Sequence, residues 1–291
     1  MPAGNLIHFR RRVRSVKNIR QITRAMKFVS ASKLKRAQER IMDARPYANR
    51  MLKVLNSVAS RAQEVPHPLL ARRGGDRTML VVVTSDKGLC GAFNSNIIRR
   101  AVKHIQDERI NRSLSLTLVG RKAVDWFKSR PWPIKHRYVN IMSKVDFKYA
   151  KVIGATLTDY YASSELDSVY LVYNEFKSVM QQEIIVEPLL PIQQLPFGEA
   201  ENESGYLYEQ PPAKILDRLL PHHVETQVFR AMLESEAAEH GARMTSMDAA
   251  TRNAKEVIEN LTLQMNRMRQ ASITTEIIEI VSGAEALGAE E

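Results

Sequence analysis

The sequence predicts an α/β protein in which a long antiparallel two-helix coiled coil, formed by the N- and C-terminal segments, accompanies a central Rossmann-like α/β domain. Near both ends of the chain, apolar and small residues recur at alternating steps of three and four. This is the spacing of a coiled-coil seam. Between the two ends, short β-branched runs alternate with helical patterns. Such an alternation is typical of a mostly parallel sheet with helices on its faces.

The first expected element is a helix from about Asn5 to Ala62, within an N-terminal coiled-coil segment 1–64. The predicted seam consists of Ile22, Met26, Val29, Ala37, Ile41, Ala44, Ala48, Met51, Leu55, Val58 and Ala62. Lys33 interrupts the stripe, and Pro46 is expected to kink the helix, because a proline inside a helix costs about 3 kcal/mol. At 1.5 Å per residue the helix would be roughly 85 Å long, which exceeds a compact domain of this size.

A linker from Val65 to Asp76, rich in proline and glycine, leads to a central α/β domain expected over 77–195. The predicted strands are Thr78–Thr84, Leu114–Val119, Arg137–Met142, Ser168–Asn174 and Glu183–Leu190, and the predicted helices are Ser95 to about Glu108, Lys122–Lys128 and Tyr149–Ser163. The segment 196–212, rich in Glu, Gly and Pro, is expected to form an exposed loop or foot.

The C-terminal coiled-coil segment is expected over 213–291. A short helix at Ala213–Leu219 precedes Pro221, which suits the first turn of a new long helix. The predicted seam consists of Val224, Val228, Ala231, Ser235, Ala238, Ala242, Thr245, Ala249, Val257, Leu261, Met265 and Met268, followed by the apolar run Ile277, Ile278, Ile280 and Val281. Small seam residues bury little apolar area but let two helix backbones approach closely. We therefore expect a thin rod that an enclosing partner stabilises.

The net charge of +11 is concentrated in one segment. Between Arg10 and Arg40 the chain carries twelve basic residues and one acid, Glu39. Such a field attracts nucleic acid, anionic lipid or an acidic protein surface, unless it is only a solvated helix face. A nucleic-acid-binding coiled-coil protein is the main alternative, but Phe28 within the segment and Phe9 directly before it are the only aromatic residues there that could stack on bases.

No segment predicts catalysis, a cofactor or a metal. The loop TSDKGLCGAFN, Thr84 to Asn94, contains GxxG and lacks both a P-loop and a dinucleotide fingerprint. It is expected to be a tight turn, which leaves a nucleotide-using α/β enzyme as a weaker alternative. Cys90, the only cysteine, excludes an internal disulfide and is expected to be a small buried residue rather than a reactive thiol beside Lys87. No run suggests a signal peptide or membrane span, so a cytosolic compartment is expected.

Three stretches resemble the gamma subunit of F-type ATP synthases of the bacterial type, and the resemblance spans essentially the whole chain. They are RRVRSVKNIRQITRAMKFVSASKLKRAQ (Arg11 to Gln38), the TSDKGLCGAFN loop, and ARMTSMDAATRNAKEVIENL with RQASITTEIIEIVSGAEAL (within Ala242 to Leu287). The sequence departs from the family's commoner YEP by inserting Gln210 before Pro211, and QMNRMRQA replaces a frequent YN.

This resemblance implies a central rotor shaft, present in one copy, that couples proton flow to the cycling of catalytic subunits and has no catalytic residue of its own. The implied partners are the alpha and beta subunits around the coiled coil, the epsilon subunit and the membrane c-ring, with no nucleic acid. The implied location is the cytoplasmic face of the cell inner membrane, as a peripheral protein held there through the complex.

The resemblance also implies specific partner-binding residues. Met26, with Arg24 and Lys27 beside it, matches the position facing an acidic beta-subunit lever. Arg243, Arg269, Gln270 and Thr274 match polar contacts with a beta-subunit catch loop. Tyr206, Tyr208 and Glu209 match the foot that contacts the c-ring and epsilon subunit.

Overall fold

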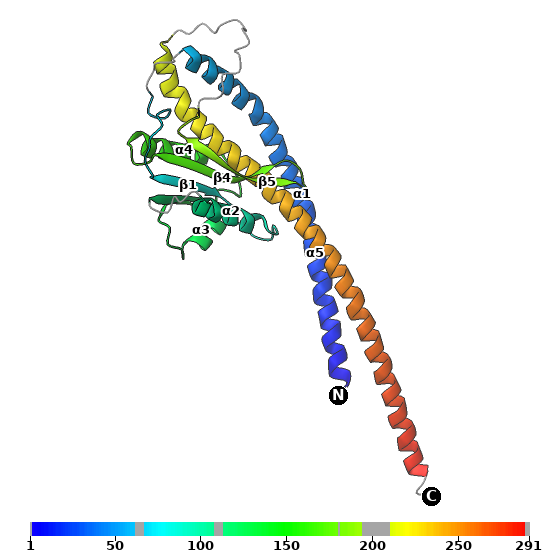
Figure 1. The fold of residues 1–291 in the computed structure, drawn as a ribbon. Helices are drawn as coiled ribbons and strands as arrows, with labels where there is room; N and C mark the ends of the chain where they lie inside the picture. Colours follow the sequence, from blue (N-terminus) through cyan, green and yellow to red (C-terminus); the bar gives the residue numbers. More distant parts are fainter. Residues whose placement is uncertain (1, 62–66, 108–112, 180, 194–209, 289–291) are drawn as a thin grey trace. The chain divides into compact units, whose positions relative to one another are not determined.

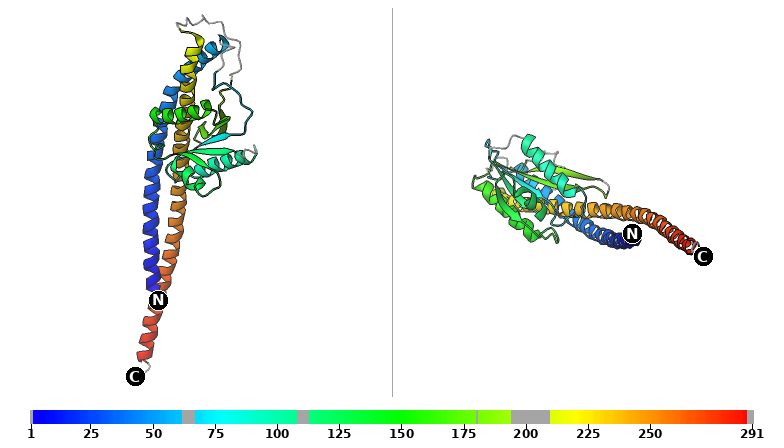
Figure 2. Two further views of the ribbon diagram at one scale, coloured as in Figure 1. Left: turned by 90° about the vertical axis from the view of Figure 1, so that its left-hand side faces the viewer. Right: turned by 90° about the horizontal axis from the view of Figure 1, so that it is seen from below.

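Two long helices contribute to both compact units of the protein (Figures 1 and 2). The computed structural model describes residues 2–61, 67–107, 113–179, 181–193 and 210–288. Helix α1 spans Pro2–Arg61 and helix α5 spans Pro212–Gly288. We term Met1–Val29 with Met244–Glu291 the helical unit, and Ser30–Arg243 the α/β unit. The predicted fold class, with long terminal helices and a central α/β domain, is confirmed.

The α/β unit contains a five-stranded sheet in the order β3-β2-β1-β4-β5. Its strands are β1 Thr78–Val83, β2 Leu114–Val119, β3 Ile134–Tyr138, β4 Ser168–Phe176 and β5 Gln182–Leu190. The first four are mutually parallel, whereas β5 pairs antiparallel with β4. Parallel neighbours need crossover connections, and helices supply them. These are α2 Phe93–Asp107, α3 Arg121–Phe127 and α4 Phe147–Ala162.

Strand β1 is buried along its whole length, and its alternate residues face two separate cores. Met79, Val81 and Val83 share a core with buried residues of α4 and of the α/β-unit portions of α1 and α5. Leu80 and Val82 share the other core with buried residues of α2 and α3. Burial on both faces explains why this strand is a continuous apolar run rather than an alternating one.

Helix α4 packs closely on α5, and Gly154 makes this approach possible. A Cβ atom at Gly154 would lie 3.0 Å from the Cα of Glu225. The same layer contains Leu34 and Ile41 of α1 and Val224 of α5, all buried. Within the α/β unit, α1 and α5 are therefore part of the globular core as well as partners of each other.

Two local predictions were wrong. Strand β3 covers Ile134–Tyr138 instead of Arg137–Met142. Helix α5 begins at Pro212 and is continuous through Pro221, so the predicted break before Pro221 does not exist. Helix α1 is helical on both sides of Pro46, where the kink stays a prediction.

Burial accounts for the continuity of α5 at Pro221. Proline removes one donor and leaves the carbonyl of Asp217 without its usual partner, but Asp217 lies on the exposed side of the helix. The neighbouring Leu220 and Val224 are fully buried. Burying two such side chains contributes about 1.5–3 kcal/mol each, which offsets the cost of the proline.

Protonation of His223 is expected to destabilise the α/β unit in acid. Burial in α5 lowers the pKa of His223 from 6.5 to about 4. Between pH 6.5 and 4 the unfolded chain therefore binds a proton that the folded chain does not, so stability falls as the pH falls through this window. The loss attributable to this residue is about 3 kcal/mol.

Chemical denaturation of the wild type and of His223→Leu at pH 7.5 and pH 5 tests this expectation. The variant should lose less stability than the wild type on acidification. His8→Leu, a change of the same type at an exposed position, should leave the pH dependence as in the wild type. An equal acid loss in the wild type and in His223→Leu would contradict the assignment.

Candidate partner interface

The helical unit is a pair of antiparallel helices held by a defined register. Thr251 Oγ1 donates to Thr23 Oγ1 at 2.8 Å, and Lys27 Nζ lies 2.6 Å from Asp248 Oδ1. Farther along, Val13 packs in one apolar cluster with Ile258 and Leu261. The two helices are therefore antiparallel, and their pairing keeps one register from Lys27 to Val13 of α1.

The buried stripe of α1 in the helical unit differs by one residue from the predicted seam. Thr23 is buried and Lys27 half-buried, whereas Ile22 and Val29 are 59% and 57% exposed. The predicted seam positions Ile22 and Val29 are therefore wrong for this part of the helix, whereas Met26 between them is half-buried. On α5, Ile258 takes the seam position in place of the predicted Val257, which is exposed, while Leu261, Met265 and Met268 are buried or half-buried.

The threonine hydroxyls at the contact between α1 and α5 form hydrogen bonds, and this makes them compatible with burial. Thr23 Oγ1 donates to the carbonyl of Arg20 at 3.1 Å, and Thr251 Oγ1 lies 2.7 Å from the carbonyl of Met247, one turn back. Each buried hydroxyl thus has a partner, and its desolvation cost is offset. The larger apolar side chains are left on the surface, where they form a second stripe on α1.

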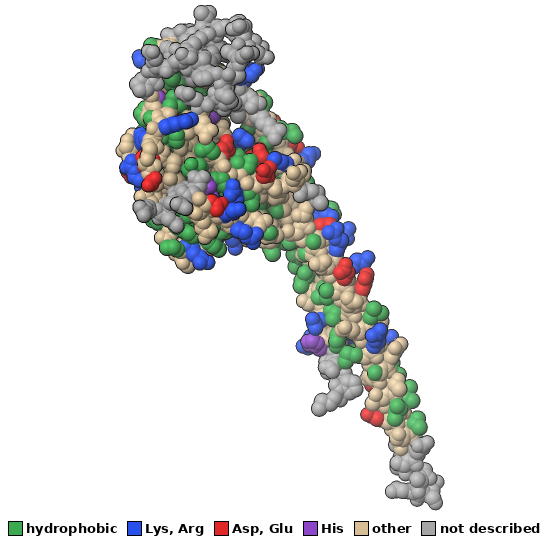
Figure 3. All heavy atoms as spheres, viewed as in Figure 1, with side chains coloured by type: hydrophobic (Ala, Val, Ile, Leu, Met, Phe, Trp, Pro, Cys, Tyr) green, Lys and Arg blue, Asp and Glu red, His purple; other side chains and the backbone are tan. Residues whose placement is uncertain are grey.

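This second stripe, which we term the outer stripe, consists of Ile19, Ile22, Met26 and Val29. Ile19, Ile22 and Val29 are exposed, and Met26 is half-buried. Arg24 is exposed beside it, and apolar and cationic side chains lie together on the surface of the helical unit (Figure 3). A helix face that carries aliphatic and positive groups fits an apolar, acidic partner.

Lys27 is engaged within the chain, unlike Arg24. Its ammonium group forms the 2.6 Å ion pair with Asp248, and this hydrogen bond lowers the pKa of Asp248. Arg252 adds a second cation, 2.8 Å from the other carboxylate oxygen of Asp248. Of the three residues expected beside the acidic lever, Arg24 therefore presents the most accessible charge.

Arg269, Gln270 and Thr274 lie together on one exposed stretch of α5. Thr274 Oγ1 donates to the carbonyl of Gln270 at 3.0 Å. The expected contact residues are thus within about one helical turn of each other. The expected foot residues Tyr206, Tyr208 and Glu209 fall outside the described residues.

Helix α5 ends in large exposed aliphatic side chains. These are Ile273, Ile277, Ile278, Ile280 and Val281, and Ile280 is 71% exposed. The pairing of Thr23 with Thr251 and of Lys27 with Asp248 places the start of α1, at Pro2, opposite a position near Ser272. The stretch of α5 beyond Ser272 therefore continues past the first residue of α1.

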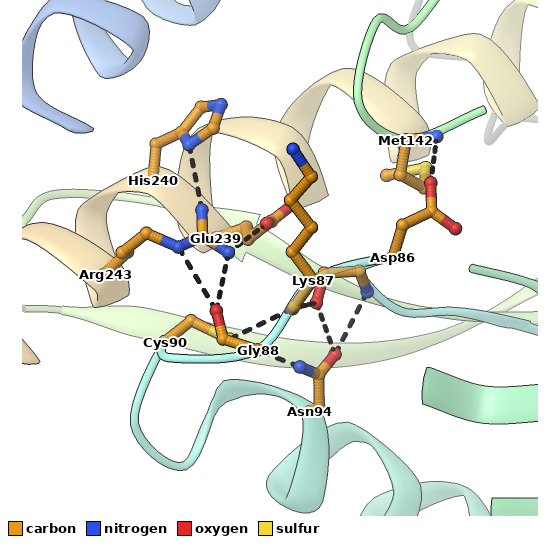
Figure 4. Close-up of polar contacts among 10 residues, drawn as sticks. Asp86, Lys87, Gly88, Cys90, Asn94, Met142, Glu239, His240 and Arg243 are labelled. Atoms are coloured by element: carbon orange, nitrogen blue, oxygen red, sulfur yellow. Dashed lines mark hydrogen bonds and ion pairs between the residues drawn. The ribbon is translucent and has the colours of Figure 1, made fainter. Parts of the chain in front are cut away.

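Arg243 lies in the α/β unit, with its side chain only 10% exposed. Its guanidinium group donates to the carbonyl of Gly88 through Nε at 3.3 Å and Nη2 at 3.0 Å (Figure 4). Nη2 also contacts Glu239 Oε1 at 2.5 Å, and Nη1 lies 3.3 Å from His240 Nδ1. This cation therefore fastens α5 to the loop that follows β1.

The loop after β1 is held from its other side by Asn94. Asn94 Oδ1 accepts from the backbone nitrogen and the hydroxyl of Ser85, both at 3.0 Å, and its amide nitrogen lies 3.2 Å from Cys90 Sγ. Cys90 is buried, as predicted, and burial raises the pKa of its thiol. Leu89, with φ 62°, is left 65% exposed at the tip of the loop.

Burial shifts the pKa values of the ionisable side chains next to Arg243. Burial raises the pKa of Glu239, although Arg243 opposes this effect. Burial, together with the positive charges of Arg243 and Lys33, lowers the pKa of His240 to about 4. At neutral pH the cluster therefore contains a neutral imidazole beside a buried ion pair.

Sequence reasoning missed Asp86 and Glu239. Asp86 accepts three backbone N–H groups, those of Arg121, Asn140 and Met142, at 3.0, 2.8 and 2.9 Å. It therefore organises the loops at the carboxyl ends of β2 and β3. The only available signal for Glu239 was its position four residues before Arg243, a spacing that lets the two side chains meet on one helix face.

In the part of the chain that the structure describes, no group of three or more His, Cys, Asp or Glu side chains is placed to hold a metal ion. Among the described helices, none has an apolar stretch long enough to span a bilayer.

Comparisons with known proteins identify relatives along nearly the whole chain. A family model described as ATP synthase matches residues 5–287. The chain is 47% identical over 285 residues to an ATP synthase gamma chain of Geobacter metallireducens, covering 98% of this chain and 99% of that one. It is 49% identical over 286 residues to an ATP synthase gamma chain of Solibacter usitatus, covering 97% and 99%.

Solved structures show the same fold. A chain of the central stalk and c-ring of the Tetrahymena thermophila mitochondrial ATP synthase aligns with a TM-score of 0.60 and 27% identity, covering 79% of this chain and 99% of that one. A chain of the Euglena gracilis mitochondrial ATP synthase aligns with a TM-score of 0.67 and 20% identity, covering 99% and 96%, and this similarity concerns the fold alone.

Proposed function

The chain belongs to the family of ATP synthase gamma chains, and on that premise we propose that it is the non-catalytic rotor shaft of an F-type ATP synthase. In this role it couples proton flow through a membrane c-ring to the conformational cycling of catalytic beta subunits. The observation that carries the proposal is the helical unit. Its two antiparallel helices are held in one register by specific contacts, and its outer stripe is apolar and cationic.

The coupling proposed here is thermodynamic. A rod with different chemistry on its different sides contacts each surrounding subunit differently and so biases each toward a different conformation. The size of that bias is limited by the difference in interaction free energy between the conformations. The sides of this rod differ in chemistry. One side of α1 carries the apolar outer stripe, and the side facing α5 carries hydroxyls and small residues.

The proposed contacts with the beta subunits follow from the exposed groups. An acidic lever would pack on Ile22 and Met26 and pair with Arg24, while Lys27 shares its charge with Asp248. A second loop of the beta subunit would hydrogen-bond to Arg269, Gln270 and Thr274. Arg243 is proposed to contribute mainly by holding the Gly88 loop in place, because most of its N–H donors are already used.

The exposed aliphatic end of α5 supports the proposal of enclosing alpha and beta subunits. Five large apolar side chains lie on this stretch, from Ile273 to Val281. Covering them with a partner removes apolar surface from water, which is favourable by about 25 cal/mol per Å². Apolar residues of the surrounding subunits would cover this stretch and would still allow it to rotate.

The remaining partners and the location are also proposals. Tyr206, Tyr208 and Glu209 are proposed to contact the epsilon subunit and c-ring, with one copy of the chain per complex, peripheral at the cytoplasmic face of the inner membrane. We propose no catalytic role, and the Gly88 carbonyl and Ser85 hydroxyl of the loop after β1 are used in internal contacts with Arg243 and Asn94. No nucleic acid partner is proposed.

Photo-crosslinking at the outer stripe tests the rotor role. Ile22→Cys in a Cys90→Ser background is labelled with a benzophenone attached through a disulfide, after purification from membranes by a tag on this chain. Two larger nucleotide-binding subunits are expected to co-purify. Irradiation should link the labelled position to one of them and reduce ATP turnover by at least about tenfold, and cleavage of the disulfide should restore turnover.

The matched control carries the label at Val152, an exposed apolar position on α4. Its irradiation should not stop turnover to the same extent. The proposal fails if the crosslinked Ile22→Cys complex turns over at the unlinked rate, or if the chain is recovered only as a free monomer.

A further inference from the structure

A groove of about 640 Å³ opens between α2 and α3 on the α/β unit. Its walls include Ile98 and Val102 from α2 and Trp126 from α3. Val102 and Trp126 are only half-buried, although both pack against the α2–α3 core. The groove therefore presents apolar surface that the α/β unit itself does not cover.

Cations without carboxylate partners border this groove. Arg99 and Lys122 line it, and Arg100 and Lys103 follow on α2. Among the described residues, no carboxylate oxygen lies within ion-pair distance of these four cations, and Arg99 donates only to Asn96 Oδ1 at 3.3 Å. Blue Lys and Arg side chains lie beside green apolar ones on the α2–α3 side of the unit in Figure 3.

The single acid that lines the groove does not balance this charge. Asp125 lies 3.7 Å from Lys128, the residue that directly follows α3, so its charge is already shared. An incoming carboxylate would meet Lys122 and Arg99 without displacing an internal partner. Charge complementarity therefore favours an acidic ligand next to the apolar walls.

The geometry of Trp126 disfavours a nucleotide or nucleic acid. Its ring stacks on Trp132, with an interplanar angle of 16°, and the Arg130 guanidinium lies 4.6 Å from its ring centroid. These neighbours occupy face area that a nucleobase would need for stacking. The groove instead accommodates side chains that insert between two helices.

We propose that the α2–α3 groove docks an acidic amphipathic segment of a protein partner. One or two branched aliphatic or aromatic side chains of that segment pack on Val102 and Trp126, and a neighbouring Asp or Glu pairs with Lys122 and Arg99. This surface goes beyond the rotor proposal, because it needs neither the outer stripe nor the aliphatic end of α5.

Site-specific photo-crosslinking in intact cells tests this proposal. p-Benzoylphenylalanine replaces Ser95, an exposed residue lining the groove. The tagged full-length chain is purified after irradiation, and the linked peptide is sequenced by mass spectrometry. The expected adduct is a protein segment that combines apolar residues with Asp or Glu. Lys122→Glu, and independently Arg99→Glu, should reduce the adduct yield by at least about fivefold.

Two controls make the charge effect specific to the groove. Lys151→Glu makes the same charge change on α4, which covers the opposite face of the sheet, and should leave the yield unchanged. Lys122→Glu introduces an acid in the first turn of α3, where a negative charge is favourable. The variant is therefore expected to fold, and unchanged Trp126 and Trp132 fluorescence would verify this.

Several outcomes would overturn the proposal. These are the absence of any adduct, an adduct with lipid, nucleotide or nucleic acid, an adduct with a segment lacking acidic residues, or a yield that Lys122→Glu and Arg99→Glu do not reduce. Failure of the rotor proposal would look different, since it would appear as missing nucleotide-binding subunits or unaffected turnover in the Ile22→Cys experiment.

Discussion

Replacement of Arg243 by alanine is expected to lower the free energy of unfolding of the α/β unit by about 3–5 kcal/mol. The change removes the donors to Gly88 and leaves the buried carboxylate of Glu239 without its cation. Removing one partner of a buried ion pair has a cost of this order, because the remaining charge is desolvated and unpaired. Denaturation followed by fluorescence of Trp126 and Trp132, both in the α/β unit, measures the loss.

The destabilisation caused by Arg243→Ala is expected to shrink as the pH falls. Burial already raises the pKa of Glu239, and loss of Arg243 removes the charge that opposes this rise. A carboxyl group with a raised pKa destabilises the fold when it is ionised, and this penalty disappears as the pH falls through the folded-state pKa. The difference between wild type and variant should therefore be smaller at pH 5 than at pH 8.

A double-mutant cycle separates this structural role from a direct contact with a partner. Arg243→Ala combined with Glu239→Gln should be less destabilised than Arg243→Ala alone, because a neutral amide does not need the cation. If Arg243 acts only through a partner subunit, the isolated chain should lose less than about 1 kcal/mol and show no coupling to Glu239. That result would return Arg243 to the set of direct contact residues.

Strand β1 was predictable because burial on both faces leaves a nearly continuous apolar run. Strand β2 is also buried along its length, but its sequence alternates leucine with Ser115 and Thr117 before Val119. Strand β3 was misplaced by three residues at its start and four at its end, because it lies at the edge of the sheet and is only partly buried. Its sequence Ile134–Tyr138 includes Lys135, His136 and Arg137, whose side chains carry no apolar signal. The pattern visible in a sequence therefore reflects how deeply a strand is buried.

The coiled-coil seam was predictable in the α/β unit and offset by one residue on α1 of the helical unit. Ala37, Ile41, Leu55 and Val58 are buried as predicted. Closer to the N-terminus, Val13 still packs in the seam. Between these stretches Ile19, Ile22 and Val29 belong to the outer stripe, and the buried positions are occupied by Thr23 and the half-buried Lys27. Apolar periodicity cannot distinguish a face buried within the chain from a face reserved for another subunit, because both exclude water.

The cluster around Arg243 could not be predicted from periodicity. Gly88 and Arg243 are 155 residues apart in the chain, and the bond between them depends on the backbone carbonyl of Gly88, which any residue type would supply. Only the i,i+4 spacing of Glu239 and Arg243 is visible in the sequence. The resemblance to a known family assigned Arg243 to a partner contact, which stays a prediction, and the structure adds the internal contacts of Arg243 with Gly88 and Glu239.

Substitution of Gly120 by alanine is expected to destabilise the α/β unit by about 3–5 kcal/mol, the sum of a backbone and a packing penalty. Gly120 follows β2 with φ 92°, a conformation that L side chains rarely adopt. An added Cβ would overlap the carbonyl oxygen of Thr84 and lie 2.7 Å from the carbonyl carbon and 2.8 Å from Oγ1 of that residue. Backbone atoms of a buried strand end cannot move aside as a flexible side chain would.

The damage from Gly120→Ala should spread through the hydrogen bonds of Thr84. Thr84 Oγ1 accepts from the backbone nitrogen of Ala123 at 2.9 Å, and Thr84 N donates to Val119 O at 2.8 Å. Displacing Thr84 therefore loosens the start of α3, and with it the wall of the α2–α3 groove. Gly74→Ala, where an added Cβ meets no atom within 4 Å, should change the denaturation midpoint little. Equal midpoints for the two variants would show that the carboxyl ends of β1 and β2 can separate at little cost, and that the groove does not depend on their close contact.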